Sequence, residues 1–238
     1  MIAMNLKIKE WDDAYTNKDN FVFYPHEEVI RFTSKYIRKR VGVSDFIDIH
    51  KGESPAKVLD VGCGIGRHVK FLHEYGLEVY GIDLSAVAIE TAQSIFTQQN
   101  LSSLNSRLYQ GCITAMPFAD NFFDFAVSHG VLDSMPFAIA QKAMTDTARC
   151  LKPGALFYLD LVSGDDREHY PEFCDEEVVE TDNEKGTIQS YFNWGKVLAL
   201  AGQQWTVMEA ALIRRTSVVS PGFHSRYHIV LQNNYCPR

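Results

Sequence analysis

The sequence lacks the patterns that mark disulfide-bonded, zinc-binding or membrane-spanning proteins. Its five cysteines, at positions 63, 112, 150, 174 and 236, form no CxxC pair, and no histidines have zinc-ligand spacing. An odd, scattered set of cysteines is typical of reduced thiols. No apolar run approaches the roughly 18 residues that span a bilayer, and the first residues show no basic-then-apolar signal. These absences predict a cytoplasmic protein with no bound metal and no membrane partner.

Positive charge is also scarce, with 23 Lys and Arg against 30 Asp and Glu and a formal net charge of -7. An acidic chain repels phosphate backbones, so nucleic acid is an unfavourable partner. One short basic run, at 38–40, follows apolar positions with helical spacing that begin near Pro25. The pattern predicts a helix over 25–40 whose last turn carries the basic residues, where they offset the negative end of the helix dipole.

What the sequence does contain is a regular alternation of short apolar runs and amphipathic segments. A chain of 238 residues suits one α/β unit. Alternating strands and helices predict a parallel sheet covered on both faces, and the last two strands, joined by a loop with Pro221 and Gly222, predict an antiparallel edge hairpin. The predicted strands are 57–61, 77–82, 107–109, 122–128, 155–162, 187–192, 205–213 and 224–231, and the further helices are 66–75, 86–99, 136–150 and 194–201.

A glycine-rich loop follows the first predicted strand. Gly62, Gly64 and Gly66 lie between that strand and a helix, where a ligand can approach the backbone closely. Asp83 ends the next strand, 21 residues after Gly62. Carboxyl ends of adjacent parallel strands are neighbours, so this carboxylate is placed to reach a ribose diol, and the combination predicts a nucleoside site. The alternative is a plain tight turn, with Asp83 capping the next helix.

Two residues indicate which nucleoside binds. A dinucleotide loop needs a third glycine at the position that Arg67 occupies here. Asp60, at the entrance of the loop, would repel a pyrophosphate but suits a ligand with an amino group and a sulfonium. The charges therefore favour S-adenosyl-L-methionine over NAD.

At this point the sequence resembles class I S-adenosylmethionine-dependent methyltransferases, from about residue 56 to the end. The resemblance implies a doubly wound, mostly parallel, Rossmann-like sheet of about seven strands with an antiparallel C-terminal edge hairpin. It also implies one domain with a lid or helical extension at 1–55, a cofactor-binding core at 56–163, an insertion at 164–185 and the rest of the sheet at 186–238. Four segments carry it: VLDVGCGIGR at 58–67, VYGIDLS at 79–85, FFDFAVS at 122–128 and RCLKPG at 149–154.

The resemblance implies a set of cofactor contacts. The methionine half would lie on the loop, Asp83 would accept from the ribose hydroxyls, and Leu84 would flank the adenine. Cys112 stands where the family often has an aspartate for the adenine amino group, so adenine would depend on backbone contacts and on packing by Ile113. The predicted cofactor residues are Asp60, Gly62, Cys63, Gly64, Gly66, Asp83, Leu84, Cys112, Ile113 and Ser128.

The candidates for chemistry follow the fourth strand. His129 has the pKa range of a base near neutral pH, although its backbone could simply border the cofactor. Asp133 fits the N-cap of the next helix better than a proton-transfer role. Arg67 and His68 could meet the cofactor carboxylate or an acidic substrate, or simply form a solvated helix start.

Three further regions are candidates for the acceptor side. Aromatic residues ahead of the core, including Trp11, Tyr15 and Tyr24, could form a lid over a sulfonium, or an arm packed on the sheet. The acidic insertion at 164–185 could attract a cationic acceptor, although a solvated loop is the usual explanation. Tyr191 and Trp194 could line an acceptor pocket or belong to the core.

Together these features predict a methyltransferase that moves a methyl group from S-adenosylmethionine to a small-molecule O, N or S nucleophile and releases S-adenosyl-L-homocysteine. RNA or protein methylation would require a basic stripe, of which only the run at 38–40 and Arg214–Arg215 give a trace. NAD-linked oxidoreduction and non-catalytic nucleotide binding are the remaining alternatives. The acceptor and the oligomeric state are left open by the sequence.

Overall fold

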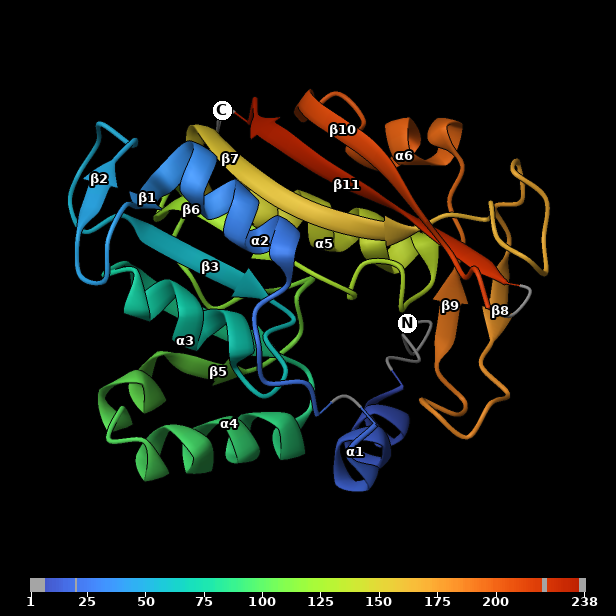
Figure 1. Cartoon of the computed structure of the whole chain (residues 1–238), viewed down its shortest axis with the longest axis horizontal. Coiled ribbons are helices and arrows are strands. Elements are labelled where there is room, and N and C mark those ends of the chain that lie inside the picture. The colour runs from blue at the N-terminus through green and yellow to red at the C-terminus, as the bar shows by residue number, and fades with distance from the viewer. Residues whose placement is uncertain (1–6, 20, 220–221, 236–238) are drawn as a thin grey trace.

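A mixed sheet of seven strands forms the centre of the protein (Figure 1). The structure is a computed structural model that describes residues 7–19, 21–219 and 222–235. The strand order is β10-β11-β7-β6-β3-β4-β5. β3 to β7 pair in parallel, whereas β11 lies antiparallel between β7 and β10. This confirms the predicted fold class, including the antiparallel C-terminal hairpin.

The element bounds follow the chain order. The helices are α1 (Ile8–Asn17), α2 (Glu27–Phe32), the π-helical turn η1 (Thr33–Ile37), α3 (Arg67–Glu74), α4 (Ala86–Gln98), the 3-10 turn η2 (Ser102–Arg107), α5 (Phe137–Cys150) and α6 (Trp194–Ala201). The strands are β1 (Arg38–Arg40), β2 (Phe46–Asp48), β3 (Lys57–Val61), β4 (Glu78–Asp83), β5 (Leu108–Gln110), β6 (Phe123–Ser128), β7 (Leu151–Val162), β8 (Glu176–Val178), β9 (Ile188–Ser190), β10 (Trp205–Thr216) and β11 (Phe223–Asn233).

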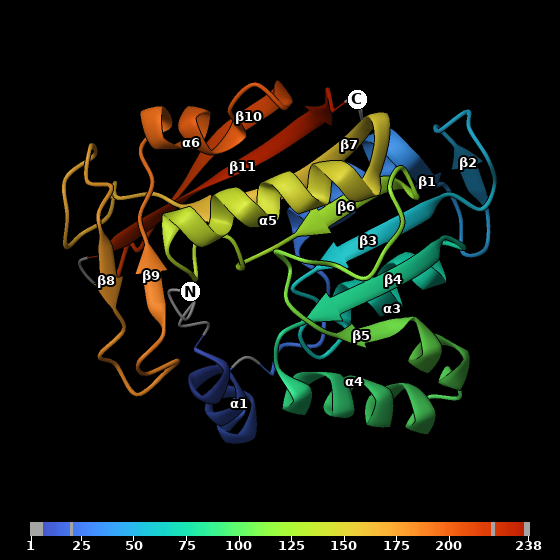
Figure 2. The same cartoon turned by 180° about the vertical axis from the view of Figure 1, so that it is seen from behind.

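The central strands are buried on both sides because helices cover both faces of the sheet. All six residues of β6 are buried, as a strand in the middle of a parallel sheet requires. One core cluster packs α2, α3 and α4 against one face, and the other packs α5 and α6 against the opposite face. Turning the molecule by 180° exchanges which layer of helices lies in front (Figure 2).

The topology creates a crevice between β3 and β6. From β3 the chain proceeds outward to β4 and β5, and then returns to β6 on the other side of β3. Ligands in open α/β sheets bind at such switch points, outside the carboxyl ends of the strands. The arrowheads of β3 and β7 point toward the side of the molecule where α1, β8 and β9 lie (Figure 1).

The predicted helix over 25–40 is wrong beyond Ile37. Arg38–Arg40 forms β1, which pairs with β2 inside the segment predicted to be purely connective. The basic side chains find partners there, because the Arg38 guanidinium ion-pairs with Asp48 and donates to the carbonyl of Tyr75. These long-range contacts override the local helical pattern.

Two other boundaries differ from expectation. β7 begins at Leu151, so the predicted turn at 152–154 lies within a strand. The 164–185 insertion, expected to be a loop, contains β8, which pairs with β9 in a separate two-stranded sheet.

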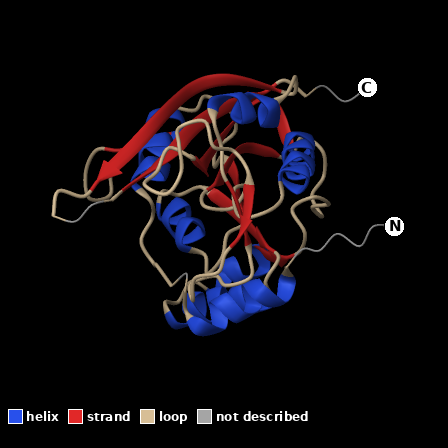
Figure 3. Cartoon of the chain, turned by 90° about the vertical axis from the view of Figure 1, so that its right-hand side faces the viewer, coloured by secondary structure: helices blue, strands red, loops and turns tan. Residues whose placement is uncertain are grey.

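The two long C-terminal strands curve over the top of the molecule in the side view (Figure 3). Pro221 and Cys236 lie outside the described residues, and the division into one domain with four parts stays a prediction.

Candidate cofactor and acceptor site

A cavity of about 320 Å³ opens at the carboxyl ends of β3, β4 and β6. This volume is at the lower end of the range for small-molecule sites. Its wall combines the loop after β3, the end of β4, the loop after β6, α1 and the segment around β9. The lining residues are Lys7, Trp11, Tyr15, Val22, Gly62, Cys63, Gly64, Ile65, Arg67, His68, Asp83, Leu84, Cys112, Ile113, His129, Gly130, Val131, Asp133, Ser134, Met135, Pro136, Ile139, Glu184, Ile188, Gln189 and Arg226.

The loop after β3 is folded tightly against β4. The amides of Gly62 and Cys63 both donate to the carbonyl of Ile82, at 2.8 and 3.0 Å. Gly62 and Gly64 have φ values of +74° and +51°, in the left-handed region that favours glycine. A Cβ atom at Gly62 would lie 2.4 Å from the side chain of Val131. The missing side chains therefore let the backbone itself form the cavity floor.

Asp83 presents a fixed carboxylate to the cavity. Its Oδ2 accepts from the Gly64 amide at 2.8 Å, and its Oδ1 accepts from the Ser85 amide at 2.9 Å. Burial raises the pKa of Asp83, while these backbone donors oppose the rise. The side-chain N-cap of α4 is Ser85, as predicted. Each Asp83 oxygen therefore keeps acceptor capacity toward the cavity, which suits a vicinal diol.

Asp60 lies beneath the loop rather than in the cavity wall. Its side chain is buried, and its Oδ2 has no hydrogen-bond partner among the described residues. Burial raises its pKa to about 7, while the charge of Arg67 acts in the opposite direction. An unpaired carboxyl oxygen and a guanidinium thus flank the glycine loop. This pair fits the ammonium and carboxylate of an amino-acid group, as the methionine half of S-adenosylmethionine would provide.

The structure separates the other predicted cofactor residues into two groups. Leu84, Cys112 and Ile113 line the cavity beside Asp83. Gly66 and Ser128 do not line it, so their direct contact with the cofactor stays a prediction. A Cβ at Gly66 would meet the ring of Phe96 in the core. The Ser128 hydroxyl donates to the carbonyl of Val61 and ties β6 to β3.

Helix α1 borders the cavity, and its role as a lid stays a prediction. Trp11 and Tyr15 line the wall, and a Cβ at Gly64 would lie 2.6 Å from the Tyr15 hydroxyl oxygen. Asp12 anchors the helix, because its Oδ1 accepts from the Ser85 hydroxyl at 2.5 Å. Tyr24 is 70% exposed and does not line the cavity, so its place in a lid stays a prediction.

The acidic insertion contributes to the cavity only near its end. Glu184 lines the wall, and so do Ile188 and Gln189 around β9, whereas the acidic residues from 165 to 177 do not. Tyr191 packs on the rings of His169 and Phe173 and does not line the cavity, which favours the packing alternative over a role in the acceptor pocket.

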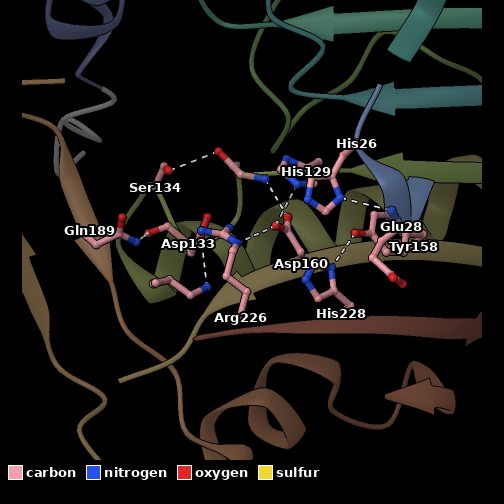
Figure 4. A network of polar contacts seen from close by, with 12 residues as sticks. His26, Glu28, His129, Asp133, Ser134, Tyr158, Asp160, Gln189, Arg226 and His228 are labelled. Atoms are coloured by element: carbon pink, nitrogen blue, oxygen red, sulfur yellow. Dashed lines mark hydrogen bonds and ion pairs between the residues drawn. The ribbon is translucent and has the colours of Figure 1, made fainter. Parts of the chain in front are cut away.

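A buried polar network beside the acceptor end was not foreseen (Figure 4). Arg226 on β11 donates to Asp160 at the end of β7, at 2.7 Å, and to Asp133 at 2.6 Å. Both carboxylates are buried, while about a quarter of the Arg226 side chain remains accessible. Asp133 also accepts from the Val162 amide, so it ties β7 and β11 to the loop after β6. The side-chain cap predicted for it is absent, because α5 begins after Pro136 with no such bond.

His129 lines the cavity, with its Nδ1 in a hydrogen bond and its Nε2 beside a carboxylate. Its Nδ1 lies 3.1 Å from Arg67 Nη2, and its Nε2 lies 3.4 Å from Asp160 Oδ2, without hydrogen-bond geometry at the latter contact. Burial lowers the pKa of His129 to about 3. A base near neutral pH needs a higher pKa. The geometry therefore favours a structural or positioning role.

Three more histidines form a cluster with His129. His26 lies against its ring at a centroid distance of 4.1 Å, His68 lies edge-on, and His228 stacks on His26. Burial lowers the pKa of each of these three imidazoles. Within the described part of the chain, no group of three or more histidine, cysteine or acidic side chains is placed to hold a metal ion. Their separation in sequence gave no signal of this cluster.

Comparison with known proteins agrees with the site. Residues 59–159 match a family model described as a methyltransferase domain. A probable chloroplastic tocopherol O-methyltransferase of Oryza sativa subsp. japonica is 36% identical over 104 residues, which cover 43% of this chain and 28% of that protein. A demethylmenaquinone methyltransferase of Lactiplantibacillus plantarum is 38% identical over 106 residues, covering 43% of each. The matches span less than half of either relative.

A solved structure extends the likeness to most of the fold. A SAM-dependent methyltransferase of Methanosarcina mazei superposes with a TM-score of 0.63 at 20% identity, over 76% of this chain and 94% of that one. Residues 59–159 are therefore similar to a methyltransferase domain, and the chain shares the fold of a SAM-dependent methyltransferase. S-adenosylmethionine is the cofactor that these matches indicate. The described part of the chain contains no helix that is long and apolar enough to cross a bilayer.

Proposed function

We propose that this protein transfers the methyl group of S-adenosylmethionine to a small-molecule O, N or S nucleophile. One observation carries the proposal: the nucleoside-side residues and an apolar pocket share one cavity under α1. Val22, Met135, Ile139 and Ile188 provide the apolar part, next to the loop after β6. A lidded site of about 320 Å³ suits a small acceptor better than a strand of RNA or a folded protein.

Each residue has a definable task in this mechanism. Asp83 accepts from the two ribose hydroxyls, while Leu84 and Ile113 pack on the adenine. Asp60 and Arg67 attract the ammonium and the carboxylate of the methionine half. When bound, the cofactor supplies a methyl group that is already activated by the sulfonium. Catalysis then consists mostly of orientation, for which Trp11 and Tyr15 close the cavity and exclude water.

The comparisons support an acceptor of small size. The rice and Lactiplantibacillus relatives are named for tocopherol and demethylmenaquinone, which are small molecules. The formal charge of -7 disfavours RNA. Arg67 at the third glycine position, and Asp60 under the loop, disfavour NAD. A cytoplasmic location stays a prediction.

Calorimetric titration with S-adenosylhomocysteine, S-adenosylmethionine and NAD tests the cofactor assignment. Asp83→Asn should weaken binding of both adenosyl compounds by about 1–3 kcal/mol, because charge-assisted hydrogen bonds to the ribose are lost. Asp124→Asn is the matched control, since that buried carboxylate accepts from the Lys57 backbone amide and the Lys152 ammonium outside the cavity wall. Tighter binding of NAD than of either adenosyl compound would contradict the proposal, as would unchanged affinity in the Asp83 variant.

A methyl-labelled donor identifies the class of acceptor. The purified protein is incubated with the labelled donor and, separately, with a small-molecule extract, total RNA and total protein. We expect label in the small-molecule fraction only. Label in RNA or protein that depends on Trp11 and Asp83 would instead identify a macromolecular substrate.

A further inference from the structure

Among the described residues, three lysine and arginine side chains line the cavity, and the proposed mechanism leaves one of them unused. Lys7 is ion-paired with an acidic residue of α1, and Arg67 attracts the methionine carboxylate in that mechanism. Arg226, on β11, is the remaining cation and belongs to the polar network beside the acceptor end. It lies between Asp133 and Asp160 (Figure 4). Its free hydrogen-bonding capacity therefore indicates what an acceptor can present there.

The guanidinium of Arg226 has donors that the network does not use. Its Nε donates to Asp160 Oδ2 at 2.7 Å, and its Nη2 donates to Asp133 Oδ2 at 2.6 Å. A guanidinium has five N–H donors, so three remain after these two bonds, and two of the three are on Nη1. Nη1 donates to no residue within the described ranges and, unlike Asp133 Oδ1, it is not enclosed. Since about a quarter of the side chain is accessible, Nη1 faces the cavity that Arg226 lines.

The two carboxylates hold this guanidinium in one orientation and keep it charged. Although burial alone would lower the pKa of Arg226, Asp133 and Asp160 hold that pKa above its usual value. Asp160 also accepts from the Gly130 amide, and Asp133 accepts from the Val162 amide, so both supports are tied to the backbone. A cation fixed by two separate supports offers a hydrogen bond of defined direction.

The charges of these three residues disfavour an anionic acceptor. Arg226 carries one positive charge, and Asp133 and Asp160 carry one negative charge each when both are ionised. Burial raises the pKa of Asp133, but even with Asp133 protonated the three groups have no net positive charge. A carboxylate or phosphate that entered this end of the cavity would lose its hydration without a net attraction in return.

A cationic acceptor is disfavoured by what the cavity exposes. The side chains of Asp133 and Asp160 are 1% and 0% exposed, so an entering group meets the guanidinium and not the carboxylates. An ammonium group only donates hydrogen bonds and would face the donors of Arg226. The acidic residues from 165 to 177 do not line the cavity, and Glu184 lines it on the side of α1, where its amide is bonded just after that helix. An uncharged oxygen meets neither obstacle, because it can accept from Nη1 and brings no charge.

We propose that Arg226 anchors the methyl acceptor by donating from Nη1 to an uncharged carbonyl or hydroxyl oxygen on an otherwise apolar molecule. The inference rests on the proposed function, because it concerns the acceptor of the same reaction. Val22, Met135, Ile139 and Ile188 form the apolar part of the cavity, which suits the carbon skeleton of such a molecule. Arg226 is thus a substrate-binding residue that selects neutral acceptors over carboxylates, phosphates and ammonium groups.

Four compounds that share one flat, apolar skeleton test this selection at neutral pH. Naphthol carries an uncharged hydroxyl, naphthoate a carboxylate and naphthylmethylamine an ammonium group at the same ring position, while naphthalene carries none of these. Each compound is titrated into the protein saturated with S-adenosylhomocysteine, and binding is followed by ligand-observed NMR. Naphthol should bind about tenfold or more tightly than the other three, as expected for a hydrogen bond from a charged donor.

Two arginine variants identify the donor. Arg226→Lys keeps a cation between the two carboxylates but removes the guanidinium, so naphthol should bind no more tightly than naphthalene does. Arg215→Lys, on β10 and outside the cavity wall, is the matched control and should leave all four affinities unchanged. Thermal melts and titration with S-adenosylhomocysteine verify that each variant is folded. If Arg226→Lys does not fold, the double variant Arg226→Met with Asp133→Asn takes its place, because it removes one charge of each sign and leaves Asp160 bonded to the Gly130 amide.

The outcomes separate this inference from the proposed function. Wild-type protein that does not bind S-adenosylhomocysteine would refute the proposed function. If it does bind, then naphthoate or naphthylmethylamine binding as tightly as naphthol would overturn the selection of a neutral oxygen. Naphthol that binds no more tightly than naphthalene, or not at all, would overturn it too. An unchanged affinity for naphthol in a folded Arg226 variant would overturn the role of Arg226 alone.

Discussion

At the scale of single residues, the site depends on side chains that are missing as much as on those present. Gly64 lies under the Tyr15 hydroxyl in a left-handed conformation, so the loop and the lid meet where any Cβ would collide. This contact joins the first strand of the core to the N-terminal helix. A glycine in a strand–loop–helix pattern was predictable, but its contact with Tyr15 was not, because nothing in the sequence relates the two.

Gly64→Ala should therefore weaken both folding and cofactor binding. We expect a loss of about 1–3 kcal/mol in the free energy of unfolding, from backbone strain plus the clash. Gly154→Ala is the matched control, since Gly154 also has a positive φ but no atom within 4 Å of the added Cβ. Adding Tyr15→Phe to Gly64→Ala should restore the part of the stability lost to the clash, but not the part lost to backbone strain. Denaturant unfolding and S-adenosylhomocysteine titration measure both effects, and equal losses in the two alanine variants would contradict the clash.

Asp60 illustrates a residue kept at a cost to stability. A carboxyl whose pKa is raised on folding binds its proton more tightly in the native state. Its destabilising effect therefore grows as the pH rises from about 4, the unfolded value, and is complete above the folded value of about 7. Asp60→Asn should stabilise the ligand-free protein at pH 8 by up to about 4 kcal/mol. Unfolding at pH 8 in urea tests this, and an equal or lower stability of the variant would refute it.

At the scale of elements, α1 is the part of the fold most directly linked to access. Its contacts come from distant segments: Asp12 accepts from Ser85 at the start of α4, and Asp19, just after the helix, accepts from the Glu184 amide. Cofactor residues, lid and insertion are thus joined around one opening. The aromatic residues before the core predicted a lid, but the polar contacts that hold it became visible only in three dimensions.

Asp12→Ala should loosen α1 without unfolding the core. We expect amide hydrogen exchange over residues 8–17 to become about 5- to 10-fold faster, as the loss of one charge-assisted hydrogen bond implies. Asp13→Ala is the control, because Asp13 pairs only with exposed Lys9. Saturating S-adenosylhomocysteine should slow the exchange again. Identical exchange in the two variants would show that the Asp12 contact does not hold the helix.

At the scale of the whole molecule, four histidines from separate segments meet beside the cavity. His26 precedes α2, His68 lies in α3, His129 follows β6 and His228 lies on β11. Burial lowers the pKa of all four in the native state, so the unfolded chain takes up protons first on acidification. The four histidines therefore stabilise the fold while they are neutral. This stability is lost as the pH falls from about 6.5, the pKa in the unfolded chain, to the lower pKa values of the native state.

Acidification from pH 7 to 5 should consequently destabilise the protein, with Asp60 acting in the opposite direction. Each histidine contributes at most about 1.4 kcal/mol per pH unit, whereas protonation of Asp60 stabilises the fold over the same range. Asp60→Asn removes that compensation, so its stability should decline more steeply than that of the wild type. Urea unfolding at half-unit intervals of pH provides the comparison. Parallel pH profiles would rule out the opposing contributions.

The sequence by itself determined the sheet, the glycine loop and the placement of Asp83, because these depend on local patterns: buried apolar runs, helix caps and the fixed geometry of a parallel pair. Only the tertiary structure decided the contacts of the polar wall, in which Arg67, His129, Asp160 and Arg226 come together from four segments. It also showed that Arg38–Arg40 forms a strand and that Tyr24 and Tyr191 lie outside the cavity. Such contacts join residues far apart in the chain, and their geometry exists only once both faces of the sheet are packed.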